Sequence, residues 1–333
     1  MLRTAIASRG PDDQRIESRL HKSINTFHVS HSEWNWIAEV RRRAGSDLRV
    51  PLGIGDDAAL LKTTGDVLVT TDMLMDGVDF IVGRTLPALI GRKCLAVNLS
   101  DIAAMAGRPT GAVVSLALPK LHGRQLADDL YDGLLKLAAE FDCPIIGGDT
   151  NSWDGPLVVN VTVLGEPTGR GVVTRAGARP GDWVFVTGPL GGSLPSQRHC
   201  TFRPRIAEAQ SLHQAVELHA MLDVSDGLAS DLFHIAEASG VGIEIVAASV
   251  PIHDAVDAAQ LFESRLHHAL ADGEDFELAF CVTEFDGRRL LANPPSGVGL
   301  FHIGRCLDEA GVWLRTGESS TPLPRSGWEH RFA

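Results

Sequence analysis

The chain has 333 residues, 44% of them hydrophobic and 22% charged, which is the composition of a globular protein and excludes disorder as its main state. Its formal net charge of −12, without a basic run or stripe, disfavours a nucleic-acid partner, although phosphate substrates remain possible if divalent cations intervene. No apolar run reaches the roughly 20 residues of a membrane-spanning helix, so no membrane partner is expected. Five scattered cysteines favour a reducing cytoplasm.

The first half of the chain alternates helical and strand patterns after a polar, basic start. Residues 1–30 lack an apolar signal-peptide core and are expected to form a flexible extension. Leucines recur on one helical face of residues 123–141, and alternating or continuous apolar runs indicate the strands. The expected elements are helices at 33–45, 89–107 and 123–141, and strands at 67–74, 110–119, 143–150 and 156–167.

Glycine, proline and arginine become dense at residues 165–182, which predicts the junction between two domains, 31–167 and 168–333. Helices and strands alternate again beyond it, and the glycine-rich GPLGGS is followed by an irregular stretch up to residue 205. The expected elements are strands at 183–188, 242–246, 276–282 and 299–304, and helices at 205–220 and 226–240. This alternation predicts layered α/β or α+β domains.

Acidic residues recur where an apolar strand ends or a helix begins. Independent turns have no reason to favour Asp beside Gly, Ser or Thr at successive strand ends, and open α/β sheets bind ligands at the carboxyl ends of their strands. The side chains are therefore expected to converge in one cluster. The set consists of Asp56 and Asp57, Asp72 after Thr70 and Thr71, Asp101, Asp149, Asp223 with Asp226, and Asp272 with Glu274 and Asp275.

Each of these acids also has an ordinary structural interpretation. Asp101 after Ser100, and Asp226 after Ser225, stand where a helix is expected to start, so capping of backbone amides explains either one taken alone. Asp149 in GGDT could belong only to a turn. The recurrence of the pattern favours function over these separate explanations.

An all-oxygen cluster predicts a hard cation. No His or Cys spacing typical of zinc and no EF-hand spacing accompanies it, so Mg²⁺ or Mn²⁺ is expected, joined to phosphate oxygens of a nucleotide. The chain has neither a Walker A loop nor protein-kinase signatures. The nucleotide charge would then be neutralised by metals and a few basic groups such as Arg175 and Lys93.

Seven motifs occur in the order and spacing of thiamine-monophosphate kinases, and the similarity covers nearly the whole chain from about Glu33 to its end. The family belongs to the superfamily of aminoimidazole ribonucleotide synthetase, selenophosphate synthetase and the hydrogenase-maturation dehydratase. The motifs are GIGDDAAL, TTDMLMDGVDF, KCLAVNLSDIAAMAGRP, IIGGDT, VVTRAGARPGDWVFVTGPLGGS, LDVSDGLASDLFHIAEASGVGIEI and DGEDFELAF.

The resemblance implies a two-domain aminoimidazole-ribonucleotide-synthetase-like fold, whose N-terminal mixed sheet forms a barrel in a homodimer and whose C-terminal α/β domain completes the active site. It implies ATP, several Mg²⁺ ions and the conversion of thiamine monophosphate to thiamine diphosphate. Metal ligands would be Asp57, Thr70, Thr71, Asp72, Asp101, Asp149, Asp223 and Asp226, and of these Asp57, Asp72, Asp101, Asp149 and Asp226 would be catalytic. ATP would be bound by Gly148, Asp149, Arg175 and Ser225, and the thiamine moiety by Glu274 and Trp328.

The implied chemistry suits such residues, because the attacking phosphate is already anionic and catalysis is mainly positioning and charge neutralisation. Two departures from the family pattern stand out. Asp79 replaces the usual His at a position that the family associates with substrate, and an Asp cannot reproduce an imidazole. Residues 193–201 replace a longer segment with an extra helix, which would open the cleft or change a lid.

Two other functions remain open from the sequence. One is a sibling ATP-dependent synthetase acting on another acceptor, although no cysteine stands in a glycine-rich entry loop as in the selenide branch. The other is a nucleotide- and metal-binding regulatory protein without turnover. The near-complete acidic set argues against loss of function, because unused clustered carboxylates would only destabilise the fold.

Overall fold

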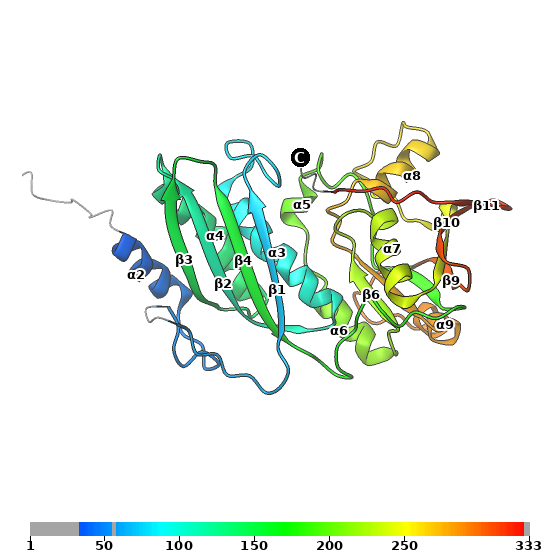
Figure 1. Ribbon diagram of the computed structural model, residues 1–333, viewed down its shortest axis with the longest axis horizontal. Coiled ribbons are helices and arrows are strands. Elements are labelled where there is room, and N and C mark those ends of the chain that lie inside the picture. The colour runs from blue at the N-terminus through cyan, green and yellow to red at the C-terminus, as the bar shows by residue number, and fades with distance from the viewer. Residues whose placement is uncertain (1–32, 55–57, 330–333) are drawn as a thin grey trace, which may run out of the picture.

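The computed structural model describes residues 33–54 and 58–329. The predicted extension 1–30 and the predicted ligand Asp57, with its neighbour Asp56, lie outside the described residues. Two sheets, one in each half of the chain, form a mixed α/β architecture, as the sequence predicted (Figure 1). Within the described ranges, no helix is long and apolar enough to cross a membrane.

The first sheet has four strands in the order β1-β4-β2-β3 and is mixed, because β2 pairs parallel with β3 and antiparallel with β4. Helices α3 and α4 cover one face (Figure 1). Helix α2 packs on α4 through Trp36, whose ring meets Tyr131 edge to face. The bounds are α2 Glu33–Ala44, β1 Leu68–Met75, α3 Pro87–Ala104, β2 Arg108–Pro119, α4 Gly123–Glu140, β3 Ile145–Trp153 and β4 Val158–Glu166.

Strand alternation decides which side chains of this sheet meet the helices. In β4, Val159, Val161 and Val163 are buried under α3, whereas the residues between them are only half-buried. The face turned away from α3 and α4 has no covering element among the described residues. In β1 this open face carries Val69 and Met73, both more than 60% exposed.

The second sheet has seven strands in the order β11-β10-β7-β9-β5-β8-β6. Helix α7 contacts β6, β7 and β10, so it covers one face of this sheet. The bounds are β5 Trp183–Val186, α5 Arg198–Thr201, α6 Ile206–Ala215, β6 Ala220–Asp223, α7 Leu228–Ser239, β7 Gly242–Val246, η1 Ala247–Ser249, α8 Phe262–Ala271, β8 Leu278–Val282, α9 Glu284–Ala292, β9 Phe301–Leu307, β10 Gly311–Thr316 and β11 Ser319–Pro322.

One predicted helix is wrong in its second part. The expected helix at 205–220 ends at Ala215, and the chain then forms β6, which pairs antiparallel with β8. All four residues of β6 are buried, and a short continuous apolar run of this kind does not reveal its structure through periodicity. Six other elements were not expected from the sequence: α5, η1, α8, α9, β10 and β11.

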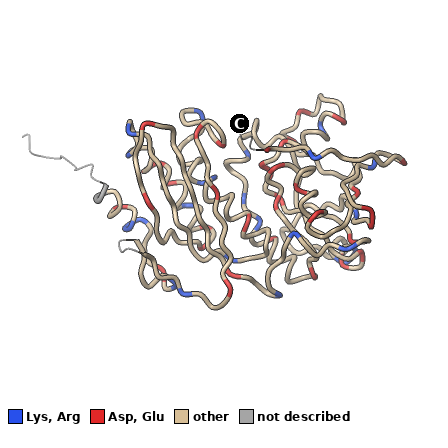
Figure 2. Tube along the Cα trace, in the orientation of Figure 1, with Lys and Arg blue, Asp and Glu red and all other residues tan. Residues whose placement is uncertain are grey.

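Helix α3 connects the two halves. It packs on β1 and β4 of the first sheet and on α5, α6 and β6 of the second half. Its residues are buried nearly all round, which is why the stretch shows no single apolar face. Lysines and arginines are scattered among acidic residues over both halves of the described chain, apart from three consecutive arginines in the last turn of α2 (Figure 2).

Candidate active site

A cavity of about 260 Å³ lies between the two halves. Its walls come from β1, α3, the loop after β6, the loop before β8 and the segment after β11, which runs back toward the middle of the molecule (Figure 1). Most of the residues proposed from the sequence line it: Asp72, Asp79, Asp101, Asp223, Ser225, Asp226, Glu274 and Trp328.

Part of the cavity wall is a carboxylate cluster made of Asp72, Asp101 and Asp223. Thr70 and Asp72 are two residues apart in β1, so both side chains face α3. The Thr70 hydroxyl donates a hydrogen bond to Asp101 in the last turn of α3. Asp223 ends β6, and its carboxylate accepts a hydrogen bond of 2.6 Å from the Ser100 hydroxyl. Three elements from two halves of the chain therefore hold the cluster.

The position of Asp101 excludes its capping interpretation. Helix α3 begins at Pro87, so Ser100 and Asp101 stand near its C-terminal end, where a carboxylate is disfavoured by the helix dipole. The interaction of Asp101 with the helix dipole is therefore unfavourable, and the residue also faces other acidic side chains. A functional requirement explains the residue better than helix stability does.

Burial and mutual repulsion raise the pKa values in the carboxylate cluster. Burial is the larger cause for Asp72, whose pKa rises to about 7 with further contributions from Asp101 and Asp79. The pKa of Asp223 also rises to about 7, from burial and then from Asp101. Burial raises the pKa of Asp101, although the Thr70 hydrogen bond and the Arg175 charge oppose the rise. A divalent cation would relieve this repulsion.

The loop of residues 225–227 is held by Asp231, a residue that the sequence analysis missed. One Asp231 oxygen accepts hydrogen bonds from the backbone amides of Ser225, Asp226 and Gly227 at 3.0–3.2 Å. Asp231 thus satisfies the amides at the start of α7, where the N-cap residue is Gly227. The signal was its position four residues after Gly227, inside the first turn.

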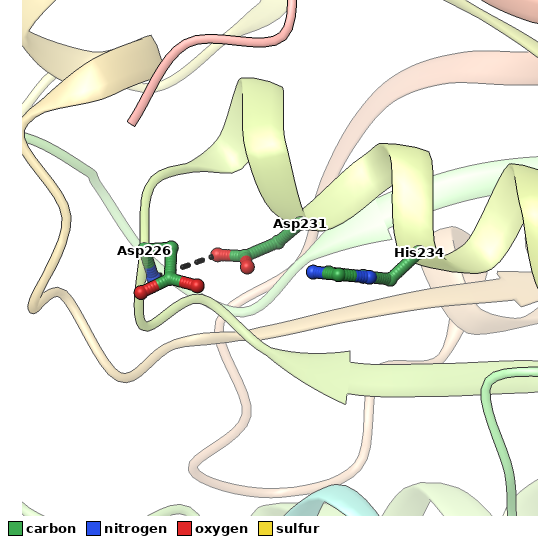
Figure 3. Close-up of side chains that lie close together, drawn as sticks. All are labelled: Asp226, Asp231 and His234. Carbon is green, nitrogen blue, oxygen red and sulfur yellow. Dashed lines mark hydrogen bonds between the residues drawn. The ribbon is translucent and has the colours of Figure 1, made fainter. Parts of the chain in front are cut away.

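His234 lies on the same side of α7, with its ring toward Asp231 (Figure 3). Asp226, Asp231 and His234 offer ligand atoms that lie within 4.8 Å of one another. Burial raises the pKa of Asp231 to about 8, and burial together with Arg175 and Arg325 lowers that of His234. Arg175 and Arg325 therefore place positive charge near His234.

The cavity is also lined by Asp79, Glu274 and Trp328. The Asp79 carboxylate accepts a hydrogen bond of 2.7 Å from the Met75 amide, so part of its capacity is used to close the turn after β1. Trp328 is about half exposed, and its amide donates to the Asp226 carbonyl at 2.9 Å. Leu194 and Phe276 add apolar surface to the cavity.

Thr71, Gly148 and Asp149 lie apart from the carboxylate cluster of the same chain. Thr71 is on the open face of β1, where its hydroxyl lies 2.9 Å from that of Thr162. Asp149 on β3 pairs in register with Ser115, which also faces that side, and its carboxylate is exposed. A Cβ at Gly148 would lie 2.1 Å from the Val114 carbonyl oxygen, so close strand packing requires this glycine.

Two further predictions concern the second half. Arg175 is exposed on the chain before β5, and its charge acts on both Asp101 and His234. The segment 193–201 ends in α5, which packs against α3, where Arg92 donates to the carbonyl oxygens of Cys200 and Phe202. The short segment is thus anchored to the first half of the molecule.

Lys93 does not have the place that the sequence analysis gave it. We expected this residue to help neutralise a nucleotide, but its side chain is 1% exposed and its ammonium group donates to Asp79 and Glu274. The sequence offered one signal, a lysine within an apolar helical run. It did not reveal the partner, because Glu274 is 181 positions away.

Comparisons with known proteins agree with this architecture. Residues 55–166 match the family model of the AIR synthase related protein, N-terminal domain, and residues 179–296 match that of its C-terminal domain. The thiamine-monophosphate kinase of Rhodopirellula baltica is 39% identical over 298 residues, covering 86% of this chain and 93% of that protein.

Two solved structures are also similar. The thiamine-monophosphate kinase from Stenotrophomonas maltophilia K279a has a TM-score of 0.75 and 35% identity, covering 85% of this chain and 96% of that one. The structure described as "AaThiL complexed with AMPPCP and TMP" has a TM-score of 0.71 and 28% identity, covering 92% of this chain and 100% of that one.

Proposed function

The chain belongs to the thiamine-monophosphate kinase family, and from this premise we propose that it transfers a phosphoryl group from ATP in line to thiamine monophosphate, forming thiamine diphosphate. The observation that carries the proposal is one cavity lined by two kinds of side chain. The clustered carboxylates Asp72, Asp101 and Asp223 are suited to cations that bind phosphates, and Glu274 and Trp328 line the same cavity. An aromatic ring beside a carboxylate suits a cationic heteroaromatic ring such as thiazolium.

The donor set supports Mg²⁺ as the cofactor. Asp72, Asp101, Asp223 and the Thr70 hydroxyl supply oxygen atoms only, and burial with mutual repulsion favours a cation among them. Bound magnesium would neutralise phosphate charge during transfer. We propose Asp226 as a further ligand, and Asp57 stays a predicted ligand outside the described residues.

The chain's own residues would act mainly by positioning. The acceptor oxygen belongs to a phosphate that is already anionic near neutral pH, so the reaction needs no strong general base. The loop of Ser225 and the Arg175 guanidinium would place ATP near the cluster, while Glu274 and Trp328 would place the thiamine moiety. Holding two repelling phosphates in line is the larger part of the task.

We also propose the homodimer, with the N-terminal sheets forming its interface. Within the described residues, β1 and β3 are the edges of the first sheet, and the open face carries Val69 and Met73. Pairing β1 of one copy with β3 of another would bring Asp149 and Gly148 next to the strand that carries Thr71. This arrangement would reunite the two separated sets of predicted ligands. The boundary between residues 167 and 168 and a cytoplasmic location stay predictions.

The test is to incubate the purified protein with ATP, Mg²⁺ and thiamine monophosphate and to separate the products by chromatography. We expect equal amounts of thiamine diphosphate and ADP, with none after EDTA and none when unphosphorylated thiamine is the acceptor. ATP binding without thiamine diphosphate would contradict the proposal. That result would favour a synthetase with another acceptor or a regulatory protein.

A further inference from the structure

Lys93 is a fully buried cation on the helix that joins the two halves of the molecule. Its neighbours Ile90, Cys94 and Leu95 are buried as well, so the ammonium group has left water almost completely. Burying a charge is costly unless it is paired and hydrogen-bonded. The partners of Lys93 therefore explain why it is tolerated there.

The ammonium group of Lys93 has three donors, and three acceptors take them up. Its Nζ donates to the Asp79 carbonyl oxygen at 2.8 Å and to the two carboxylate oxygens of Glu274 at 2.7 and 2.8 Å. No donor remains for a ligand, so the group lies in the cavity wall without being able to bind phosphate. Lys93 thus connects two residues that line the cavity, Asp79 from the first half of the chain and Glu274 from the second.

The loop that carries Glu274 has a backbone that needs support. Gly273, Glu274 and Phe276 all have positive φ values, of 72°, 54° and 52°, and this region is costly for residues with a side chain. The Glu274 amide donates to the Ser225 carbonyl at 2.7 Å, and the Ser193 hydroxyl donates to the Glu274 carbonyl at 2.6 Å. The backbone is thus fixed by the C-terminal half, whereas the carboxylate is held by Lys93 from the N-terminal half.

We propose that Lys93 is a positioning residue that holds the Glu274 carboxylate and the Asp79 turn at the cavity wall, and thereby sets the affinity for the thiamine moiety. The inference rests on the proposed function. The Glu274 side chain remains 25% exposed, and its oxygens have acceptor capacity beyond the two bonds to Lys93. Without the lysine, the carboxylate would be free to leave the wall or would repel Asp79.

The matched control is a second ion pair near the same loop, one whose carboxylate is buried. Arg205 donates to both oxygens of Glu277, at 2.9 and 2.5 Å, and the Glu277 side chain is buried. Neither residue lines the cavity. Arg205→Met therefore reports what loss of a neighbouring ion pair does to the fold alone.

The experiment measures KM for thiamine monophosphate and for ATP in Lys93→Met, Glu274→Gln, the double variant and Arg205→Met. We expect Lys93→Met to raise KM for thiamine monophosphate about 10–100-fold, the range of a lost hydrogen bond to a charged group, with KM for ATP within about twofold. Arg205→Met lowers the melting temperature but leaves both KM values unchanged. In the Glu274→Gln background, Lys93→Met should raise KM for thiamine monophosphate by less than about a further twofold, because Lys93 acts through the Glu274 carboxylate.

Unchanged KM for thiamine monophosphate in Lys93→Met, or an equal rise of both KM values, would overturn the inference. So would a rise in Arg205→Met as large as in Lys93→Met. If Lys93→Met fails to fold, KM for thiamine monophosphate is compared between the double variant and Glu274→Gln. The double variant is expected to fold, because removing both partners leaves no unpaired buried charge. A double variant clearly worse than Glu274→Gln would refute action through Glu274. Inactive wild-type protein would instead refute the proposed function.

Discussion

The two faces of the first sheet each carry an aspartate, but the surroundings of the two side chains differ. On the face toward α3, Asp72 is largely buried beside two other acids, and its pKa rises to about 7. On the open face, Asp149 is exposed to solvent. Thr70 and Thr71 are adjacent in sequence but belong to different faces. Tertiary surroundings, rather than residue type, create the strained cluster.

The largest expected effect is on the buried face. Asp72→Asn keeps the shape of the side chain but removes its charge, so kcat should fall about 10²–10³-fold, the range for a group that stabilises transition-state charge. The melting temperature without Mg²⁺ should not fall, because a repelling buried carboxylate has been removed. Steady-state kinetics at saturating Mg²⁺ and a thermal scan with EDTA check both statements. Activity above a tenth of the wild-type value would exclude Asp72 from the site.

The next prediction tests whether the open face works through a second copy. Val69 is 64% exposed on that face, and Val69→Lys should weaken self-association by about 30-fold, which corresponds to about 2 kcal/mol. Sedimentation velocity measures the shift toward monomer. In the monomer, kcat should fall to the level of Asp149→Asn, because the partner can no longer supply Asp149.

The control for this experiment is Leu261→Lys, since Leu261 is 78% exposed and lies before α8, away from the first sheet. It should leave association and kcat unchanged. A Val69→Lys variant that is monomeric yet fully active would show that the open face has no part in the site.

The third prediction uses the pKa values of the buried face. Asp72 and Asp223 have pKa values of about 7 in the folded protein and about 3.9 in the unfolded chain, so the unfolded chain loses these protons first. Their contribution to stability therefore falls as pH rises from about 4 to about 7 and stays low above that. With EDTA, the melting temperature should be about 3 °C higher at pH 6 than at pH 8.

Mg²⁺ should reverse this trend, because it binds the ionised carboxylates and so stabilises the protein more at pH 8 than at pH 6. Asp72→Asn should flatten the pH dependence measured with EDTA. Equal stabilisation by Mg²⁺ at both pH values in the wild-type protein would argue against a metal in this cluster.

The smallest effect is expected at Asp231, which contributes to the free energy of unfolding through its hydrogen bonds rather than through its charge. Its pKa of about 8 leaves the group mostly neutral at pH 7, and its main task is to accept three backbone amides. Asp231→Asn retains an acceptor oxygen, so the free energy of unfolding should change by less than about 1 kcal/mol. Asp231→Ala should cost about 1–3 kcal/mol, measured by urea denaturation. Equal losses in both variants would mean that the charge matters.

Much of the site was visible in the sequence, because its residues stand at strand ends within extended local motifs. Asp72, Asp101, Asp223 and Glu274 were all proposed from such positions, and the structure brings them to one cavity. The helix at 123–141 and the strands around 110–119 and 156–167 were also predicted, since their apolar periods are strong and local. Local patterns fail where a short apolar run has no period of its own, as at β6.

The sequence by itself determined the mixed α/β fold, the family and most residues of the cavity. Only the tertiary structure decided which of those residues meet. Asp149 lies on the face of the first sheet opposite to Asp101. Lys93, expected near a nucleotide, pairs with Glu274, and Asp231 accepts hydrogen bonds from the Ser225 loop. These outcomes depend on the packing of α3 between two sheets, and such contacts join residues that no local pattern relates.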